Sequence, residues 1–283
     1  MRAFSTRAGR WSLALTLAAV ATLAARADEP PAPLPITAPG VPSLTIGDVI
    51  TVSNASGGTE LGSLRWALLR ANAQETIRFD PSLAGATITL DSTLNVARHV
   101  TLEGPANRSI TLSGGGVRRV MYIAEGAHLK NLTITGSYDP VVAGGIFAYG
   151  PVLIENTTLH DNKAGSAAGI YGEKITFINS AITANTAEAL ASGISWDMDQ
   201  GLTLINTTVA RNGPAPGLRG HGNTSGKGRV HLENSIIVGN GTPVSNCWYP
   251  SETFVRVGLN IADDLTCGGD TTQMLVRDPR QPW

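Results

Sequence analysis

A repeat of 24 residues runs through the middle of this 283-residue chain. Four dipeptides of glycine followed by isoleucine or leucine fall on this spacing: Gly145-Ile146, Gly169-Ile170, Gly193-Ile194 and Gly217-Leu218. A fixed period in this range predicts a solenoid, in which each repeat buries its apolar face only against its neighbours. Residues one period apart should therefore stack in columns, and a functional surface should be built from such columns.

Between Thr76 and Ile261 the chain alternates short apolar segments with Gly, Asn and Asp. The segments are rich in β-branched residues and have the length of strands, as in Thr87–Leu90 and Ile110–Leu112. Coils of 23–28 residues predict seven or eight turns of strands stacked about 4.8 Å apart. We expect residues 76–245 to form these coils.

Asparagines repeat with the coils in two groups that lie six residues apart. The first group is Asn131, Asn156, Asn179, Asn206 and Asn234, and the second is Asn162, Asn185, Asn212 and Asn240. Because an amide both donates and accepts, we expect the first group to stack as a buried hydrogen-bonded ladder. The Asn-x-Thr sequons within that group would then be inaccessible to glycosylation.

Residues 44–75 precede the coils and predict a cap made of one strand and one helix. Leu64, Ala67, Leu68 and Ala71 have helical spacing, and Ser63 is a plausible N-cap. The first coil of a solenoid exposes apolar side chains and strand edges, and an amphipathic helix would cover them.

Residues 1–27 have the pattern of a signal peptide, with Arg2, Arg7 and Arg10 before an uncharged run and a small-x-small site at Ala25-Arg26-Ala27. An N-terminal anchor helix is the alternative, but the run is short for a membrane span. Residues 28–43 carry six prolines and predict an extended linker. We therefore expect a protein that is secreted, periplasmic or at the cell surface.

The charge of the exported chain argues against nucleic-acid binding. The sequence has 21 basic and 22 acidic residues, and cleavage would remove four arginines, which leaves 17 against 22 and a net charge of −5. No basic patch stands out. No later apolar run is long enough to span a membrane, and we expect a monomer.

Cys247 and Cys267 are the only cysteines, and in an exported chain they predict a disulfide. The bond would close a loop of about 20 residues, and the chain-entropy model gives a stabilisation of about 3 kcal/mol for a loop of this size. This loop lies within a C-terminal end formed by residues 246–283. No cofactor is expected. The adjacent acids Asp263 and Asp264 are a weak calcium candidate, because they lack further ligands.

The segments Ser63–Leu68 and Val100–Pro105, the Gly-Ile and Asn-Ser/Thr repeats, and the ending from Asn246 to Cys267 resemble a known family. They are similar to secreted bacterial right-handed parallel β-helix proteins of the polymorphic outer-membrane-protein and choice-of-anchor type. The resemblance implies an all-β right-handed parallel β-helix and covers residues 47–270. Such relatives usually continue into an anchoring region, so the end at Trp283 favours free secretion or periplasmic residence.

Three columns follow from the 24-residue register. Ile146, Ile170, Ile194 and Leu218 form an apolar column that we expect to face inward. By alternation, two further columns should share an outer face: Phe147, Tyr171, Ser195 and Arg219, and then Tyr149, Glu173, Asp197 and His221. Trp196 would then point inward, unless a turn begins there and places its ring on the outer face.

This face is the strongest candidate for function. Glu173 and Asp197 would be neighbouring carboxylates, an arrangement that can divide acid and base roles. Aromatic rings beside carboxylates also suit sugars. We expect binding by Phe147, Tyr149, Tyr171, Trp196 and Arg219.

A second resemblance is to polygalacturonase-like β-helix glycosidases, which place acids one coil before a Gly-His-Gly turn. Here Gly220-His221-Gly222 follows Asp197-Met198-Asp199 by one coil. The resemblance implies catalysis by Glu173, Asp197, Asp199 and His221, with an acid and a base on either side of the bond. However, the acids are not adjacent, and no downstream Arg-x-Lys follows.

The sequence therefore predicts a secreted or envelope-associated protein that binds a polymer, most plausibly a polysaccharide or a cell surface. A polysaccharide hydrolase or lyase is the alternative function, and a purely structural solenoid is the third.

Overall fold

The computed structural model describes residues 49–106, 110–197, 200–221, 229–241, 245–248, 253–267 and 274–276. The chain divides into residues 1–42 and 43–283, and all described residues belong to the second unit. The predicted signal peptide and proline-rich linker lie outside the described residues.

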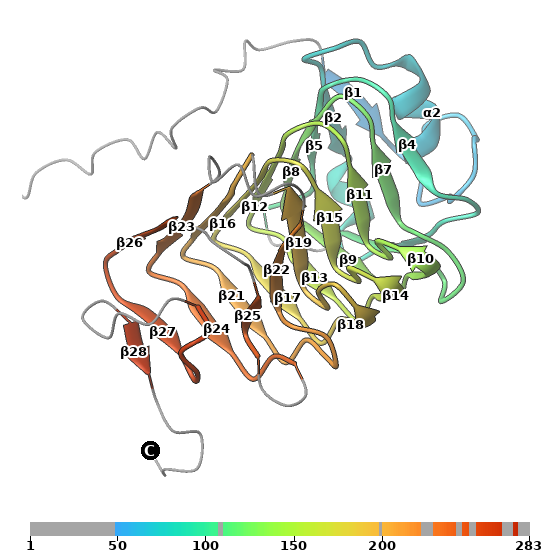
Figure 1. The fold of residues 1–283 in the computed structure, drawn as a ribbon. Helices are drawn as coiled ribbons and strands as arrows, with labels where there is room; N and C mark the ends of the chain where they lie inside the picture. Colours follow the sequence, from blue (N-terminus) through green and yellow to red (C-terminus); the bar gives the residue numbers. More distant parts are fainter. Residues whose placement is uncertain are drawn as a thin grey trace, which may run out of the picture. The chain divides into compact units, whose positions relative to one another are not determined.

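The coils form parallel sheets, and every neighbouring pair of strands comes from successive turns (Figure 1). Sheet A contains β1 (Val49–Val52), β2 (Thr76–Phe79), β5 (Val100–Glu103), β8 (Ala127–Lys130), β12 (Val152–Glu155), β16 (Ile175–Ile178), β20 (Leu202–Ile205), β23 (Arg229–Glu233) and β26 (Thr253–Val257). Sheet B contains β3 (Thr87–Thr89), β6 (Ile110–Ser113), β9 (Leu132–Thr135), β13 (Thr158–His160), β17 (Ala181–Thr183), β21 (Thr208–Ala210), β24 (Ile236–Val238), β27 (Asn260–Ala262) and β28 (Met274–Val276).

Two further sheets complete the coils. Sheet C contains β4 (Leu94–Val96), β7 (Met121–Ile123), β11 (Ile146–Ala148), β15 (Ile170–Gly172), β19 (Ile194–Asp197), β22 (Leu218–His221) and β25 (Cys247–Trp248). Sheet D is an additional side on three coils, with β10 (Tyr138–Val142), β14 (Lys163–Ser166) and β18 (Thr186–Ala189). The predicted parallel β-helix of about eight turns is confirmed.

Apolar side chains fill the inside of the coils, because alternate residues of each short strand face inward. The predicted inward column of sheet C is confirmed, with Ile146, Ile170, Ile194 and Leu218 paired in register and fully buried. Each coil packs on the next, so the buried surface is continuous along the axis.

The predicted helix is present as α2 (Leu64–Arg70). Ser63 is its N-cap, since its Oγ accepts a hydrogen bond of 3.1 Å from the Trp66 amide and donates to the Gly58 carbonyl. Leu64 and Ala67 are buried against the first strands. A short 3-10 turn, η1 (Pro81–Leu83), follows β2.

A buried asparagine ladder exists, but the second group forms it and not the predicted first group, in which Asn206 Nδ2 donates to Asn179 Oδ1 at 3.2 Å at an exposed position. Asn162, Asn185, Asn212 and Asn240 are at most 1% exposed. Each Nδ2 donates to the Oδ1 of the next asparagine at 2.8–2.9 Å and the series ends on Asn246. Each Nδ2 also donates to a backbone carbonyl of an earlier coil. Both amide donors are therefore satisfied without water.

The asparagines predicted to form the ladder lie at corners between sheets A and B. All five adopt the left-handed conformation, with φ between 47° and 57°, which asparagine tolerates better than most residues. Asn179, Asn206 and Asn234 are exposed. The predicted burial of the Asn206 sequon was therefore wrong. The buried residue at each corner is the Ser or Thr that follows, such as Thr207.

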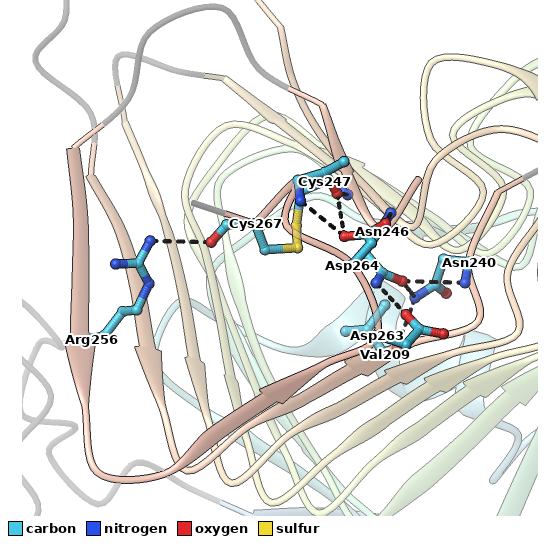
Figure 2. Close-up of a disulfide and its surroundings, with 9 residues drawn as sticks. Val209, Asn240, Asn246, Cys247, Arg256, Asp263, Asp264 and Cys267 are labelled. Carbon is cyan, nitrogen blue, oxygen red and sulfur yellow. Dashed lines mark hydrogen bonds between the residues drawn. A yellow bond between two sulfur atoms is a disulfide. The ribbon is translucent and has the colours of Figure 1, made fainter. Parts of the chain in front are cut away.

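The C-terminal end closes the ladder (Figure 2). The predicted disulfide joins Cys247 and Cys267, with a Cα–Cα distance of 5.0 Å. Asn246 donates from Nδ2 to Asp263 at 2.5 Å and from its backbone amide to Asp264 at 2.8 Å. The two carboxylates therefore receive the last donors of the ladder, and the disulfide holds them there.

Candidate functional site

The outer face of sheet C carries the residues that the sequence singled out. Phe147, Tyr171, Ser195 and Arg219 pair in register on successive strands, and the column extends to Tyr122 on β7 and Trp248 on β25. Asp197 pairs with His221, and both are half-buried, whereas Glu173 and Tyr149 are exposed. The predicted outward direction of these two columns is confirmed.

Trp196 requires a correction, because its side chain is fully buried and cannot contact a ligand at the surface. No turn begins at this residue, since β19 continues to Asp197. Its neighbours in register are Gly172 and Gly220, and their missing side chains leave room for the indole ring inside the coil.

The aromatic rings of the outer column stack on one another. Tyr122 and Phe147 have centroids 5.8 Å apart with an interplanar angle of 9°, and Phe147 and Tyr171 have centroids 5.1 Å apart at 19°. Both faces of Phe147 are therefore occupied by protein rings. Such offset stacks stabilise a fold by about 0.5–1.5 kcal/mol per pair, and they leave only ring edges for a ligand.

Tyr149 is arranged differently. Its ring lies 5.1 Å from Phe147 at 66° and 5.9 Å from Tyr122 at 71°. Because both faces of Phe147 are occupied, Tyr149 lies at the edges of the stack. Tyr149 is 52% exposed, so this residue is open to solvent beside the stack.

Trp248 is the second exposed ring, with 48% of the residue accessible. The guanidinium carbon of Arg219 lies 4.0 Å from the ring centroid, which is a cation–π geometry. Arg219 therefore holds the indole from one side. Sequence reasoning missed Trp248 because Leu218 pairs with Cys247, a step of 29 residues that departs from the 24-residue register.

Ser195 leaves a gap in the column that two rings close. Tyr171 and His221 stack across it at 4.2 Å and 24°. His221 Nδ1 lies 3.1 Å from Ser195 Oγ, and Ser195 is fully buried beneath them. Burial lowers the pKa of His221, and Arg219 lowers it further, whereas Asp197 opposes the shift. The imidazole is therefore neutral near pH 7.

The carboxylates lie beside the stack. Burial raises the pKa of Tyr171, and the charge of Asp197 raises it further, with smaller effects from Tyr149 and Glu173. Asp197 and Glu173 are thus close to the Tyr171 ring, as the register implies. Asp199, the remaining predicted catalytic residue, lies outside the described residues.

The described part of the chain contains no group of three or more His, Cys, Asp or Glu side chains arranged for a metal. The calcium candidates Asp263 and Asp264 are already occupied by donors. Asp263 accepts from Asn246 and from the Gly239 amide, and Asp264 accepts from Asn246 and Thr266. Several N–H groups aimed at these oxygens disfavour a cation there.

Among the described helices, none combines the length and the apolar character needed to cross a bilayer. Residues 88–262 match the model of a family described as "Right handed beta helix region". No curated protein gives a significant match. Among solved structures, the crystal structure of the pectate lyase Pel9A aligns with a TM-score of 0.47 at 16% identity. That alignment covers 77% of this chain and 62% of the pectate lyase.

Proposed function

The chain belongs to the right-handed β-helix family, and we propose that it is an exported protein that binds polysaccharide on the outer face of sheet C. The observation that carries this proposal is the exposure of Tyr149 beside the aromatic stack. Beside a column whose rings cover each other, Tyr149 lies across the stack and is 52% exposed. A sugar ring can stack on an exposed aromatic residue while its hydroxyls bond to neighbouring polar groups.

The position of Trp248, the second exposed ring, predicts the minimum length of the ligand. Trp248 lies four strands beyond the coil of Tyr149 in sheet C. At a strand spacing of about 4.8 Å, the two rings are about 20 Å apart along the axis. Asp197, His221 and Arg219 lie between them or beside them. The proposed ligand is therefore a polymer that runs along the coils and contacts a ring at each end.

Export completes the proposal. The signal-like sequence at residues 1–27 and the buried disulfide both fit an oxidising compartment. The resemblance to polymorphic outer-membrane and choice-of-anchor proteins suggests a place at the cell envelope. We propose that the mature protein acts as a monomer on polysaccharide outside the cytoplasm.

Binding of Tyr149→Ala to a panel of soluble polysaccharides, measured by affinity electrophoresis, tests this function. We expect at least a tenfold loss relative to wild type. Tyr138→Ala is the matched control, since Tyr138 is 45% exposed but belongs to sheet D. Equal binding by all three proteins would contradict the site, and absence of binding by wild type would contradict the function.

Cleavage of the bound polymer, by hydrolysis or by a lyase reaction, is the second candidate function. Asp197 and His221 pair in register on β19 and β22, and the imidazole is neutral, as a general base requires. A reducing-sugar assay with wild type and Asp197→Asn separates the two functions. Release by wild type that Asp197→Asn abolishes supports catalysis, whereas binding without release supports a binding protein.

A further inference from the structure

The hydroxyl of Ser195 has a single partner, and that partner belongs to the candidate site. Ser195 is fully buried below the stacked rings of Tyr171 and His221. Its Oγ lies 3.1 Å from His221 Nδ1, and within the described part of the chain this is the one hydrogen bond that either atom makes. The direction of this bond therefore decides which hydrogen-bonding group His221 offers to a ligand.

The bond can run in two directions, which differ in what they leave unpaired. If Nδ1–H of His221 donated to Ser195 Oγ, the hydroxyl hydrogen would be buried with no acceptor. If the hydroxyl donates to Nδ1, its hydrogen is satisfied and no other buried hydrogen remains. An unpaired buried donor is costly, so the second direction is favoured. A neutral imidazole carries one ring hydrogen, which then lies on Nε2.

The second ring nitrogen of His221 can be reached from solvent. Burial lowers the pKa of His221, so the ring is neutral near pH 7. Nε2 has no hydrogen-bond partner in the part of the chain that the structure describes, and it is not buried. In sheet C, β22 with His221 lies beside β25 with Trp248 and beyond the coil of Tyr149. The Nε2–H group therefore lies on the path between the two exposed rings.

We propose that Ser195 is a positioning residue that holds His221 in the Nε2–H tautomer, so that His221 donates a hydrogen bond to an oxygen of the bound polysaccharide. This inference rests on the proposed function and adds a directed donor to its site. A neutral imidazole could also act as a base, but only through the nitrogen without hydrogen, which is Nδ1 and is occupied by Ser195. If the polymer is cleaved, the base is then a carboxylate such as Asp197.

The nitrogen chemical shifts of His221 test the tautomer directly, because a ring nitrogen with hydrogen and one with a lone pair give separate NMR signals. In wild type near pH 7 we expect hydrogen on Nε2 and none on Nδ1. The spectrum of His221→Gln identifies the signals among the five histidines. Ser195→Ala should shift the Nδ1 signal and let some Nδ1–H form appear. Ser192→Ala removes a buried hydroxyl that donates to Ala187 instead, and it should leave the signals of His221 unchanged.

An oligosaccharide cut from the polysaccharide that wild type binds best tests the donor role. On binding, we expect the Nε2–H signal of His221 to shift and the Nδ1 signal to move much less. His221→Phe keeps a ring that can stack on Tyr171 but has no donor. Because a neutral hydrogen bond is lost, this variant should bind the oligosaccharide roughly threefold to tenfold more weakly than wild type in isothermal titration.

Each part of the proposal can be overturned separately. Hydrogen on Nδ1 in wild type, or His221 signals that do not change in Ser195→Ala, would show that Ser195 does not set the tautomer. Binding that leaves the Nε2–H signal in place and that His221→Phe retains in full would contradict the donor role. If wild type has the expected tautomer but binds no oligosaccharide, the proposed function fails and the donor role falls with it, so the two failures are distinguishable.

Discussion

The same repeat builds two columns with different roles, the buried asparagine ladder and the aromatic column on the outer face of sheet C. The buried asparagines of the ladder bond to one another, so every amide hydrogen has a partner inside the protein. The rings on the outer face of sheet C also stack on one another, but that column is incomplete, because Tyr149 lies across it and Ser195 interrupts it. The ladder stabilises the fold because its amides bond to one another. The outer column marks the candidate site because not all of its rings are covered by other rings.

Breaking the ladder should have the largest effect on stability. Asn212→Ala removes hydrogen bonds to Asn240 and the Ile182 carbonyl, and it removes the Oδ1 that accepts from the backbone amide and from one side-chain hydrogen of Asn185. We expect a loss of about 3 kcal/mol in the free energy of unfolding, measured with urea. Asn206→Gly is the control at an exposed left-handed corner, where glycine is well tolerated. Equal losses in the two variants would contradict the distinction between ladder and corner.

Removing the disulfide at the end of the ladder should lower the free energy of unfolding by a similar or smaller amount. Replacing Cys247 and Cys267 together by serine opens a loop with a sequence separation of 20 residues. The chain-entropy model gives a loss of about 3 kcal/mol, and measured values are often lower. Urea unfolding of the double variant measures the loss. An unchanged unfolding midpoint would mean that the carboxylates of Asp263 and Asp264 close the ladder without covalent help.

The outer stack should respond differently at two neighbouring rings. Phe147→Leu removes stacking on both faces of Phe147 and should lower stability by about 1–2 kcal/mol. Tyr149→Leu removes only the ring that covers the edges, so its stability loss should be smaller while its loss of polysaccharide binding should be larger. A reversed order in both measurements would contradict the division between structural and binding rings.

The smallest effect concerns pH. The pKa of His221 is lowered in the folded state below its ordinary value of 6.5. Between the two pKa values the unfolded chain binds more protons, so the contribution of His221 to stability is complete above pH 6.5 and decreases as the pH falls. From pH 7 to pH 5, the urea midpoint of wild type should therefore fall relative to that of His221→Gln. A difference that does not change with pH would contradict the burial of this imidazole.

The sequence predicted the coils because periodicity and strand-length apolar segments depend only on spacing. It assigned the ladder to the wrong asparagines for a physical reason. Asn156 and Asn162 repeat with the same period, and the period does not show that one is a left-handed corner and the other faces inward. A residue that adopts φ near 50° and precedes a buried Ser or Thr is recognisable only once the corner is seen.

The candidate site was predicted in part for a similar reason. Alternation placed Phe147, Tyr171 and His221 outward, but it could not show that Phe147 is covered on both faces. Trp196 was assigned to binding on the condition that a turn begins there, but β19 continues to Asp197, and the glycines of the adjacent strands leave space for the indole inside the coil. Trp248 was missed because the repeat lengthens before β25.

The length dependence of glycan binding tests the central claim most directly. Isothermal titration with an oligosaccharide series should show affinity that increases with chain length until the ligand spans the distance of about 20 Å between Tyr149 and Trp248 and then levels off. Tyr149→Ala and Trp248→Ala should each lower the affinity of the long ligands and remove the gain with length. Affinity that is independent of length, or a length dependence that survives both substitutions, would contradict a ligand that runs along the coils between these two rings.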